Sequence, residues 1–308
     1  MPLARNLTVR AVALRLLVVV ALLGGSAYWS VHQSRYHFTK TIVSLPQGVT
    51  FSSNPAQFAV SPDGQQLAMN LTSADGKARV WSWQLDNPDA RPLGGTEGVT
   101  AIPAWAPDGQ NIAFVVGGKL RRVPVAGGAV ETICEVSPDA TLDWGKDGTI
   151  LFANGGTDPL RRIVAASGGA PQQITKVFPD ERHMFPKFVP GANRFLFSVL
   201  VPSDPFREGV WMGSFDGGKG ARLLPGTVIA DVAGDFIVYS QDTLVVAQRF
   251  AAATGDFSGM PVTLADHIRV ADNPRRPAYS VSPTRLAFQS DDGVLHLLTD
   301  WPALLQGQ

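Results

Sequence analysis

The sequence contains a single cysteine and few charged residues. Because Cys134 is alone among 308 residues, neither an intrachain disulfide nor a cysteine-based zinc cluster can form. We expect its thiol to act as a small buried hydrophobe. Charged residues make up 17% of the chain, below the usual ~25%, whereas Gly (31) and Pro (23) are abundant. This composition favours many turns between short strands.

Several motifs that carry catalysis are missing as well. The sequence has no Gly-x-x-x-x-Gly-Lys-Ser/Thr phosphate loop, no Gly-x-Ser-x-Gly nucleophile elbow and no His-x-x-x-His pair. The Asp291-Asp292-Gly293 stretch lacks the alternating acids of a calcium loop, so we expect it in a hairpin turn. The sequence therefore predicts no cofactor, no metal and no catalytic residue.

The charge balance separates the first 40 residues from the rest. Lys plus Arg and Asp plus Glu each number 26, so the formal net charge is zero. Residues 1–40 hold five of the bases and no acid, which leaves 21 bases against 26 acids in the remainder. A mildly acidic body attracts phosphate backbones weakly, so we expect no nucleic-acid partner.

Residues 16–31, LLVVVALLGGSAYWSV, are uncharged and follow three arginines. With residues 11–14 added and Arg15 snorkelling to the interface, this stretch is long enough for a transmembrane signal-anchor helix. The bases before it predict that residues 1–15 form a short cytoplasmic tail and that the chain after residue 32 lies outside. The alternative is a cleaved signal peptide, with Gly25, Ser26 and Ala27 as small residues at the cleavage site. Both interpretations export the body of the protein.

A short turn motif recurs through that body. Ser61-Pro62-Asp63-Gly64 returns as Ala106-Pro107-Asp108-Gly109, as Gly145-Lys146-Asp147-Gly148 and, degraded, as Val189-Pro190-Gly191-Ala192. Apolar runs flank each copy, and two further alternating stretches follow it, as strands require. Because the motif returns once per unit, we interpret its residues as structural: Pro62, Asp63, Gly64, Pro107, Asp108, Gly109, Asp147 and Gly148.

Six units result, starting near residues 58, 102, 141, 185, 230 and 278. Four short strands at a period of about 40–45 residues predict an all-β fold, a six-bladed β-propeller over residues 41–308, after a linker at 32–40. The sixth unit has little room for a fourth strand. We therefore expect Lys40–Leu45 to supply the outer strand of the last blade and to close the ring. A β-sandwich is the alternative, but it does not explain the period.

The repeats resemble the TolB-type, WD-like propellers of bacterial envelope proteins. A closer resemblance is to the extracytoplasmic propeller of bacterial transmembrane serine/threonine kinases. The segments that carry it are Leu85–Gly98, Trp105–Gly128, Arg182–Gly218 and the ending DWPALL at Asp300–Leu305. This resemblance covers about residues 16–308 and implies a propeller on the outer side of a membrane helix. The sequence has no counterpart of the kinase domain, with neither His-Arg-Asp nor Asp-Phe-Gly.

One acidic and basic cluster, Asp180-Glu181-Arg182-His183, lies in the long connection between units three and four. The connections that enter the innermost strands should lie on one face of the ring. The loops that join second and third strands, such as Val201–Glu208, should lie on the same face. Binding residues are often found on such loops. The expected ligand-binding residues on this funnel face are Glu97, Asp143, Asp180, Glu181, Arg182, His183, Asp231, Arg275 and Arg276. The alternative is that these loops are only solvated or ion-paired.

The sequence favours a non-catalytic binding module, a sensor or scaffold anchored in the cytoplasmic membrane, with its propeller on the periplasmic or extracellular side. Its partner would be an envelope protein, a peptide or a small ligand. One alternative is a hydrolase of the lactonase or phosphoesterase kind, which needs several metal-binding side chains around one point of the central channel. Another is the sensor remnant of a transmembrane serine/threonine kinase.

Overall fold

The computed structural model describes residues 38–87, 90–217, 220–226, 229–272 and 275–305. The expected membrane segment at 16–31, with His32 and His37 after it, lies outside these residues. Within them, no helix has the length and apolar character needed to cross a bilayer. The chain divides into two compact units, residues 1–38 and 39–308, and the second unit contains the β-strands.

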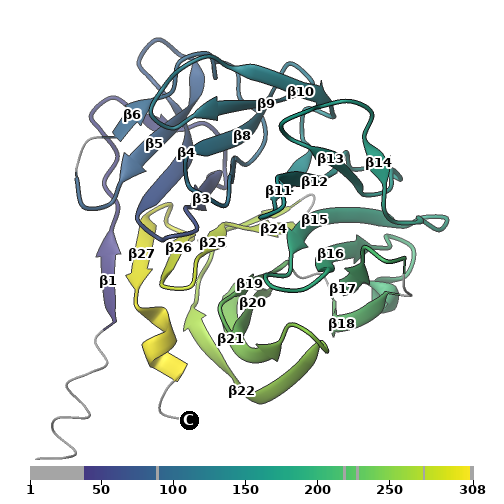
Figure 1. The fold of residues 1–308 in the computed structure, drawn as a ribbon. Coiled ribbons are helices and arrows are strands. Elements are labelled where there is room, and N and C mark those ends of the chain that lie inside the picture. The colour runs from purple at the N-terminus through teal and green to yellow at the C-terminus, as the bar shows by residue number, and fades with distance from the viewer. Residues whose placement is uncertain (1–37, 88–89, 218–219, 227–228, 273–274, 306–308) are drawn as a thin grey trace, which may run out of the picture. The chain divides into compact units, whose positions relative to one another are not determined.

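Six antiparallel sheets follow one another around a common axis, in chain order (Figure 1). Blade 1 contains β3 (Phe58–Val60), β4 (Gln66–Thr72), β5 (Ala78–Gln84) and β6 (Ala90–Pro92). Blade 2 contains β7 (Ala104–Trp105), β8 (Asn111–Val116), β9 (Lys119–Pro124) and β10 (Glu131–Glu135). Blade 3 contains β11 (Thr141–Trp144), β12 (Thr149–Ala153), β13 (Arg161–Val164) and β14 (Gln172–Gln173).

The second half of the ring repeats this plan. Blade 4 contains β15 (Arg182–Phe188), β16 (Arg194–Leu200), β17 (Gly209–Ser214) and β18 (Ala221–Pro225). Blade 5 contains β19 (Ala230–Ala233), β20 (Phe236–Gln241), β21 (Leu244–Ala251) and β22 (Asp256–Ala265). Blade 6 contains β25 (Tyr279–Val281), β26 (Arg285–Gln289), β27 (Leu295–Thr299) and β1 (Thr39–Ile42). The predicted six-bladed propeller is confirmed.

Blade 6 is completed by the N-terminal strand, as predicted. β1 pairs antiparallel with β27, with Thr39 opposite Thr299 and Ile42 opposite His296. The pairing continues past β1, because the Val43 N–H donates to the Leu295 carbonyl at 2.9 Å. In Figure 1 the purple β1 lies beside the yellow β27. Closure covers the edge of β27, which would otherwise be open to pairing with another chain.

Apolar residues form six core clusters, and each cluster lies between two neighbouring blades. The alternation of side chains along a strand explains this arrangement. Leu67 and Met69 of β4 pack toward blade 6, whereas Ala68 between them packs toward blade 2. Each sheet thus has two buried faces, and closing the ring buries the last of them against the first.

Three strands were not predicted from the sequence. β2 (Thr50–Phe51) pairs with β4 beside β3, and β23 (Val270–Asp272) pairs with β24 (Arg275–Pro277) ahead of blade 6. Strands of two or three residues are too short to show an alternating pattern. Two short 3₁₀ helices complete the structure, η1 (Pro205–Arg207) and η2 (Trp301–Leu305). Trp301 of η2 is fully buried between blades 5 and 6, and its indole N–H donates to the Ser282 carbonyl at 2.9 Å.

Candidate functional site

The recurring Asp-Gly turns join the first and second strands of blades 1 to 3. The carboxylate of Asp63 accepts the Gln65 N–H at 2.9 Å, and Asp108 accepts the Gln110 N–H at the same distance. Asp147 also accepts a backbone N–H two residues on, that of Thr149, at 2.9 Å. The glycine that follows each aspartate has a positive φ, between 69° and 78°. These carboxylates hold their own turns, in the manner of an Asx turn.

Two loops of blade 4 meet at one rim of the ring. The connection into β15 and the loop between β16 and β17 are joined by a hydrogen bond from the Ser203 N–H to the Asp180 carboxylate, at 2.9 Å. A second link is an ion pair between Arg207 and Glu181, with Nη2 and Oε1 2.5 Å apart. We call the residues 178–183 and 201–208 the blade 4 rim. The sequence predicted that these two segments share a face.

Glu181 is the centre of this contact, because its carboxylate is buried and has partners on several sides. Besides Arg207, Oε2 accepts the Phe178 N–H at 3.2 Å and lies 3.6 Å from Nε2 of His183. His183 is also buried, with Nδ1 2.9 Å from the Thr175 hydroxyl and its ring against Phe197. Burial lowers the pKa of His183 although Glu181 opposes the shift, so the imidazole is neutral at pH 7.

Two phenylalanine side chains are exposed at the blade 4 rim. Phe206 is 91% exposed and Phe178 is 55% exposed. Phe206 lies in η1, where the Asp204 side chain accepts its N–H at 3.2 Å and Arg222 donates to its carbonyl at 2.6 Å. An exposed aromatic side chain on a backbone held at both ends suits protein recognition, because little ordering is required on binding. The position of this loop between the second and third strands of its unit predicted that it lies at the rim, but nothing in the sequence distinguished Phe206.

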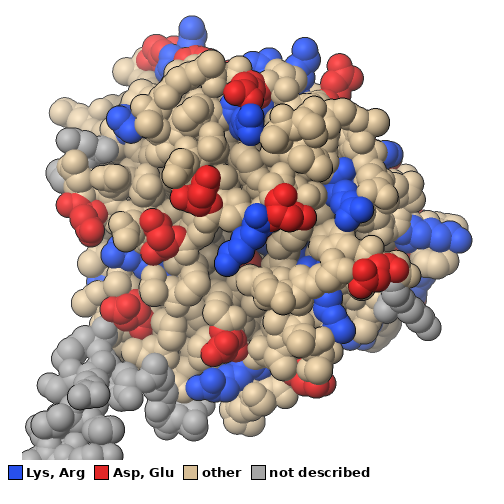
Figure 2. Space-filling model, in the orientation of Figure 1, with Lys and Arg blue, Asp and Glu red and all other residues tan. Residues whose placement is uncertain are grey.

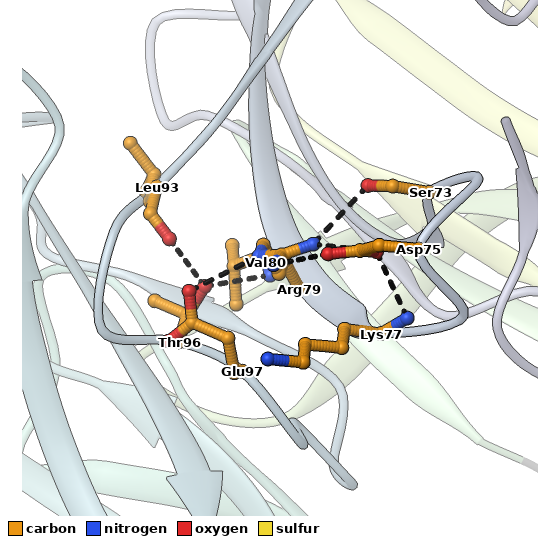
Figure 3. Close-up of polar contacts among 8 residues, drawn as sticks. All are labelled: Ser73, Asp75, Lys77, Arg79, Val80, Leu93, Thr96 and Glu97. Carbon is orange, nitrogen blue, oxygen red and sulfur yellow. Dashed lines mark hydrogen bonds and ion pairs between the residues drawn. The ribbon is translucent and has the colours of Figure 1, made fainter.

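Glu97 lies on blade 1, apart from the blade 4 rim, in a polar cluster of its own (Figure 3). Its Oε1 atom is 3.0 Å from Nε of Arg79, and Nη2 of Arg79 is 2.7 Å from the Asp75 carboxylate. The hydrogen bond from Arg79 lowers the pKa of Asp75 to about 2. Next to Glu97, the Thr96 hydroxyl accepts the Val80 N–H and donates to the Leu93 carbonyl. These contacts fasten the connection from blade 1 to blade 2.

Asp143 and Asp231 do not lie in rim loops but on the inner strands β11 and β19, where they line a central cavity of about 1060 Å³. Lys187, on the inner strand β15 between them, contacts both. Its Nζ atom is 2.7 Å from Oδ2 of Asp231 and 3.7 Å from Oδ1 of Asp143. Three successive blades therefore meet through charged groups in the channel. Alternate side chains of an inner strand face the same neighbouring blade, and Asp143 thus faces β15. Lys187 was not predicted because these positions were expected to lie in loops.

The surroundings in the channel shift the pKa values of Asp143, Lys187 and Tyr279. Burial raises the pKa of Asp143 to about 6, with Lys187 opposing the shift and Asp231 adding to it. Burial disfavours the charge on Lys187, but the two carboxylates outweigh it, so its pKa lies above the ordinary value. Tyr279 of β25 is half-buried and packs against the cluster between blades 5 and 6, and its hydroxyl donates to the Ile229 carbonyl at 2.8 Å. Burial, and then Asp231, raises the pKa of this phenol.

Arg276 lines the cavity from β24 and donates to the carbonyls of Pro55 and Ala56. Burial lowers its pKa to about 10, so the guanidinium stays charged at pH 7. Arg275 lies beside it in β24, and Arg182 is exposed at the start of β15. The predicted site residues thus fall into three groups, on blade 1, at the blade 4 rim and around the channel.

Among the described residues, no three His, Cys, Asp or Glu side chains are arranged to hold a metal ion. Cys134 of β10 is half-buried against the cluster between blades 2 and 3, and burial raises its thiol pKa to about 11.

Charged groups of both signs are interspersed over the face in Figure 2 and do not gather into one patch of a single sign. His296 of β27 stacks on Phe288, with ring centroids 5.0 Å apart.

No protein-family model matches the sequence, and no curated protein matches it. Solved structures do match the fold. TolB from Acinetobacter baumannii matches with a TM-score of 0.50 and 13% identity, over 80% of this chain and 54% of that chain, so this chain spans about half of that protein's length. A putative TolB from Agrobacterium tumefaciens matches with a TM-score of 0.53 and 18% identity, over 79% and 89% of the two chains. Hydrazine synthase from Kuenenia stuttgartiensis matches with a TM-score of 0.53 and 12% identity, over 85% and 82%. At these identities the likeness is one of fold, and the chain has the TolB-type β-propeller fold.

Proposed function

We propose that this chain is a membrane-tethered, extracytoplasmic propeller that binds a protein partner through the blade 4 rim. The observation that carries this proposal is Phe206, a side chain that is 91% exposed on a loop fastened by one ion pair and several hydrogen bonds. A large aromatic group costs free energy when water surrounds it, and a few such groups supply most of the binding energy at protein interfaces. The partner would present an apolar pocket for Phe206.

The charges near Phe206 indicate the rest of the partner's chemistry. Arg182 is exposed at the rim, Lys176 lies over the Phe178 ring at 5.7 Å, and Arg207 is exposed but paired with Glu181. Asp180 is exposed there as well, but its carboxylate accepts the Ser203 N–H. Exposed bases around aromatic groups favour a partner whose apolar pocket has acidic residues at its margin.

The location outside the cytoplasm depends on the sequence alone, namely on Arg5, Arg10 and Arg15 ahead of the apolar run at 16–31. The non-catalytic role is supported by the channel, where the Lys187 ammonium contacts both Asp143 and Asp231. In a hydrolase of the metal-dependent kind those carboxylates would instead face a cation that activates water.

Capture experiments with the full chain test the binding proposal. We expect membrane extracts to yield a protein that is enriched with the wild type and reduced at least tenfold with Phe206→Ala. Met260→Ala is the matched control, because Met260 is 76% exposed but lies on β22, the outer strand of blade 5. Equal recovery with Phe206→Ala and the wild type would contradict the role of the rim. A C-terminal alkaline phosphatase fusion tests the location, since the enzyme is expected to be active only if the propeller is exported.

A further inference from the structure

The cavity at the centre of the ring has the size and walls of a small-molecule site. Its volume of about 1060 Å³ is at the upper end of the range for ligand pockets, ~300–1,000 Å³. Aromatic residues of the inner strands belong to its lining. Trp144, Phe188 and Tyr279 are half-buried there, whereas Phe58, Trp105 and Phe185 are buried. Apolar walls with a small number of polar groups are typical of a pocket that binds an organic ligand.

Three charged groups that contact one another in the cavity are not balanced among themselves, and Arg276 is a further cation of the lining that forms no ion pair with a described carboxylate. Asp143 and Asp231 provide two carboxylates, and Lys187 provides the one ammonium group that pairs with them. Lys187 favours Asp231, at 2.7 Å, and reaches Oδ1 of Asp143 only at 3.7 Å, longer than a hydrogen bond. With both acids ionised, this group of three carries a net charge of −1.

The remaining oxygens of the pair already have partners. Oδ2 of Asp143 accepts the Phe188 N–H at 2.7 Å, and Oδ1 of Asp231 accepts the Val232 N–H at 2.8 Å. Oδ1 of Asp143 lies 3.7 Å from the Lys187 ammonium, and the backbone N–H groups of Phe188 and Trp144 hydrogen-bond to this carboxylate. A positively charged donor on a bound ligand would approach Oδ1 more closely than Lys187 does and would neutralise the excess negative charge of the three groups.

We propose that the central cavity binds a small organic cation, an amine or guanidine with an apolar body, whose charged group donates to Asp143 and whose body packs on the aromatic walls. Cations are attracted to the faces of aromatic rings as well as to carboxylates. This site goes beyond the proposed function, because it lies in the channel and uses no residue of the blade 4 rim.

Arg276 defines the competing possibility. Its guanidinium also lines the cavity, and among the described residues no carboxylate lies within ion-pair distance of it. A ligand whose charged group binds to the Arg276 guanidinium would be an anion. Probes that share one body and differ in charge separate the two cases.

Calorimetric titration of the full-length chain at pH 7.5 with benzylamine, benzyl alcohol and benzoate tests this proposal. We expect benzylamine to bind and the other two to bind at least tenfold more weakly. Asp143→Asn should weaken benzylamine binding at least tenfold, while Glu131→Gln, on the outer strand of blade 2, should leave it unchanged. Stronger binding of benzoate, equal binding by Asp143→Asn, or no binding of benzylamine would overturn the proposal.

A second measurement does not depend on a variant that folds. Because the pKa of Asp143 is about 6, its negative charge is lost as the pH falls below that value. Benzylamine keeps its charge over this range, so the affinity of the wild type should fall at least fivefold between pH 7.5 and pH 5. An affinity that stays constant over this range would contradict a role for Asp143 in binding.

Discussion

Arg207 and Glu181 join the two loops of the blade 4 rim, with Nη2 and Oε1 2.5 Å apart. Glu181 is buried, whereas the side chain of Arg207 is 50% exposed. The pair therefore connects the interior of blade 4 to the loop that carries Phe206. The rigidity of this loop, and with it the preorganisation of Phe206, depends on Glu181.

Replacing Glu181 should loosen the loop. In Glu181→Ala the Phe178 N–H and the Arg207 guanidinium lose their shared acceptor, which costs about 1–3 kcal/mol. Hydrogen exchange of the amides in residues 201–208 should become faster than in the wild type. Exchange in β20, in the core of blade 5, serves as the internal reference and should not change. Unaltered protection of residues 201–208 would show that Glu181 does not hold the loop.

Asp143→Asn should change how stability depends on pH. The pKa of Asp143 in the folded chain is about 6, above its ordinary 3.8, so the folded state holds the proton more tightly than the unfolded state. The contribution of this carboxyl to stability is thus fully present below about pH 4 and lost as the pH rises through 6. The free energy of unfolding of the variant should rise relative to the wild type between pH 4 and pH 7. Denaturant titrations at several pH values measure this difference, and a constant difference would contradict the raised pKa.

Trp301→Ala should destabilise the propeller strongly. Trp301 is fully buried between blades 5 and 6 and lies edge-on to Phe236, with ring centroids 5.5 Å apart. Truncating a buried tryptophan costs about 3–5 kcal/mol. Phe206→Ala is the matched control, because it removes an exposed aromatic group and should change stability by less than about 0.5 kcal/mol. Equal melting temperatures for the two variants would contradict the role of Trp301 in packing blades 5 and 6 together.

A comparison of Gly64, in the turn of blade 1, with Gly109, in the equivalent turn of blade 2, tests the contact between blades 1 and 6. Gly64 and Gly109 have similar φ values, 75° and 69°, so alanine costs about 1–2 kcal/mol at either position. A Cβ atom at Gly64 would also meet the Thr284 hydroxyl at 2.6 Å, whereas nothing lies within 4 Å of one at Gly109. Gly64→Ala should therefore lower the free energy of unfolding more than Gly109→Ala does. The reverse order in denaturant titrations would count against the contact between the turn and blade 6.

The repeat made the fold predictable from sequence. Inner strands begin at residues 58, 104, 141, 182, 230 and 279, within three residues of the predicted unit starts. A repeat sets strand order and blade number together, and the missing fourth strand in the last unit identified β1 as its closing strand. β2 and the β23–β24 hairpin escaped prediction because their pairing depends on neighbours and not on a pattern of their own.

The candidate site was predictable only in part. The sequence predicted that the Asp180–His183 segment and the 201–208 loop lie on one face. Successive strands of a blade run in opposite directions, so every second connection lies on the same face of the ring. It did not separate Asp143 and Asp231 from the rim, since their orientation depends on the register of β11 and β19. Lys187 was missed for the same reason. The exposure of Phe206 could not be predicted, because an apolar residue in a loop can as well fold inward.

The most direct test of the proposed function places a photo-reactive phenylalanine analogue at position 206 of the full chain in living cells. Position 260 is the control, being similarly exposed but on the outer strand of blade 5. Irradiation should give a discrete cross-linked protein from position 206 and none from position 260. No adduct at position 206, or the same adducts at both positions, would contradict partner binding at the blade 4 rim.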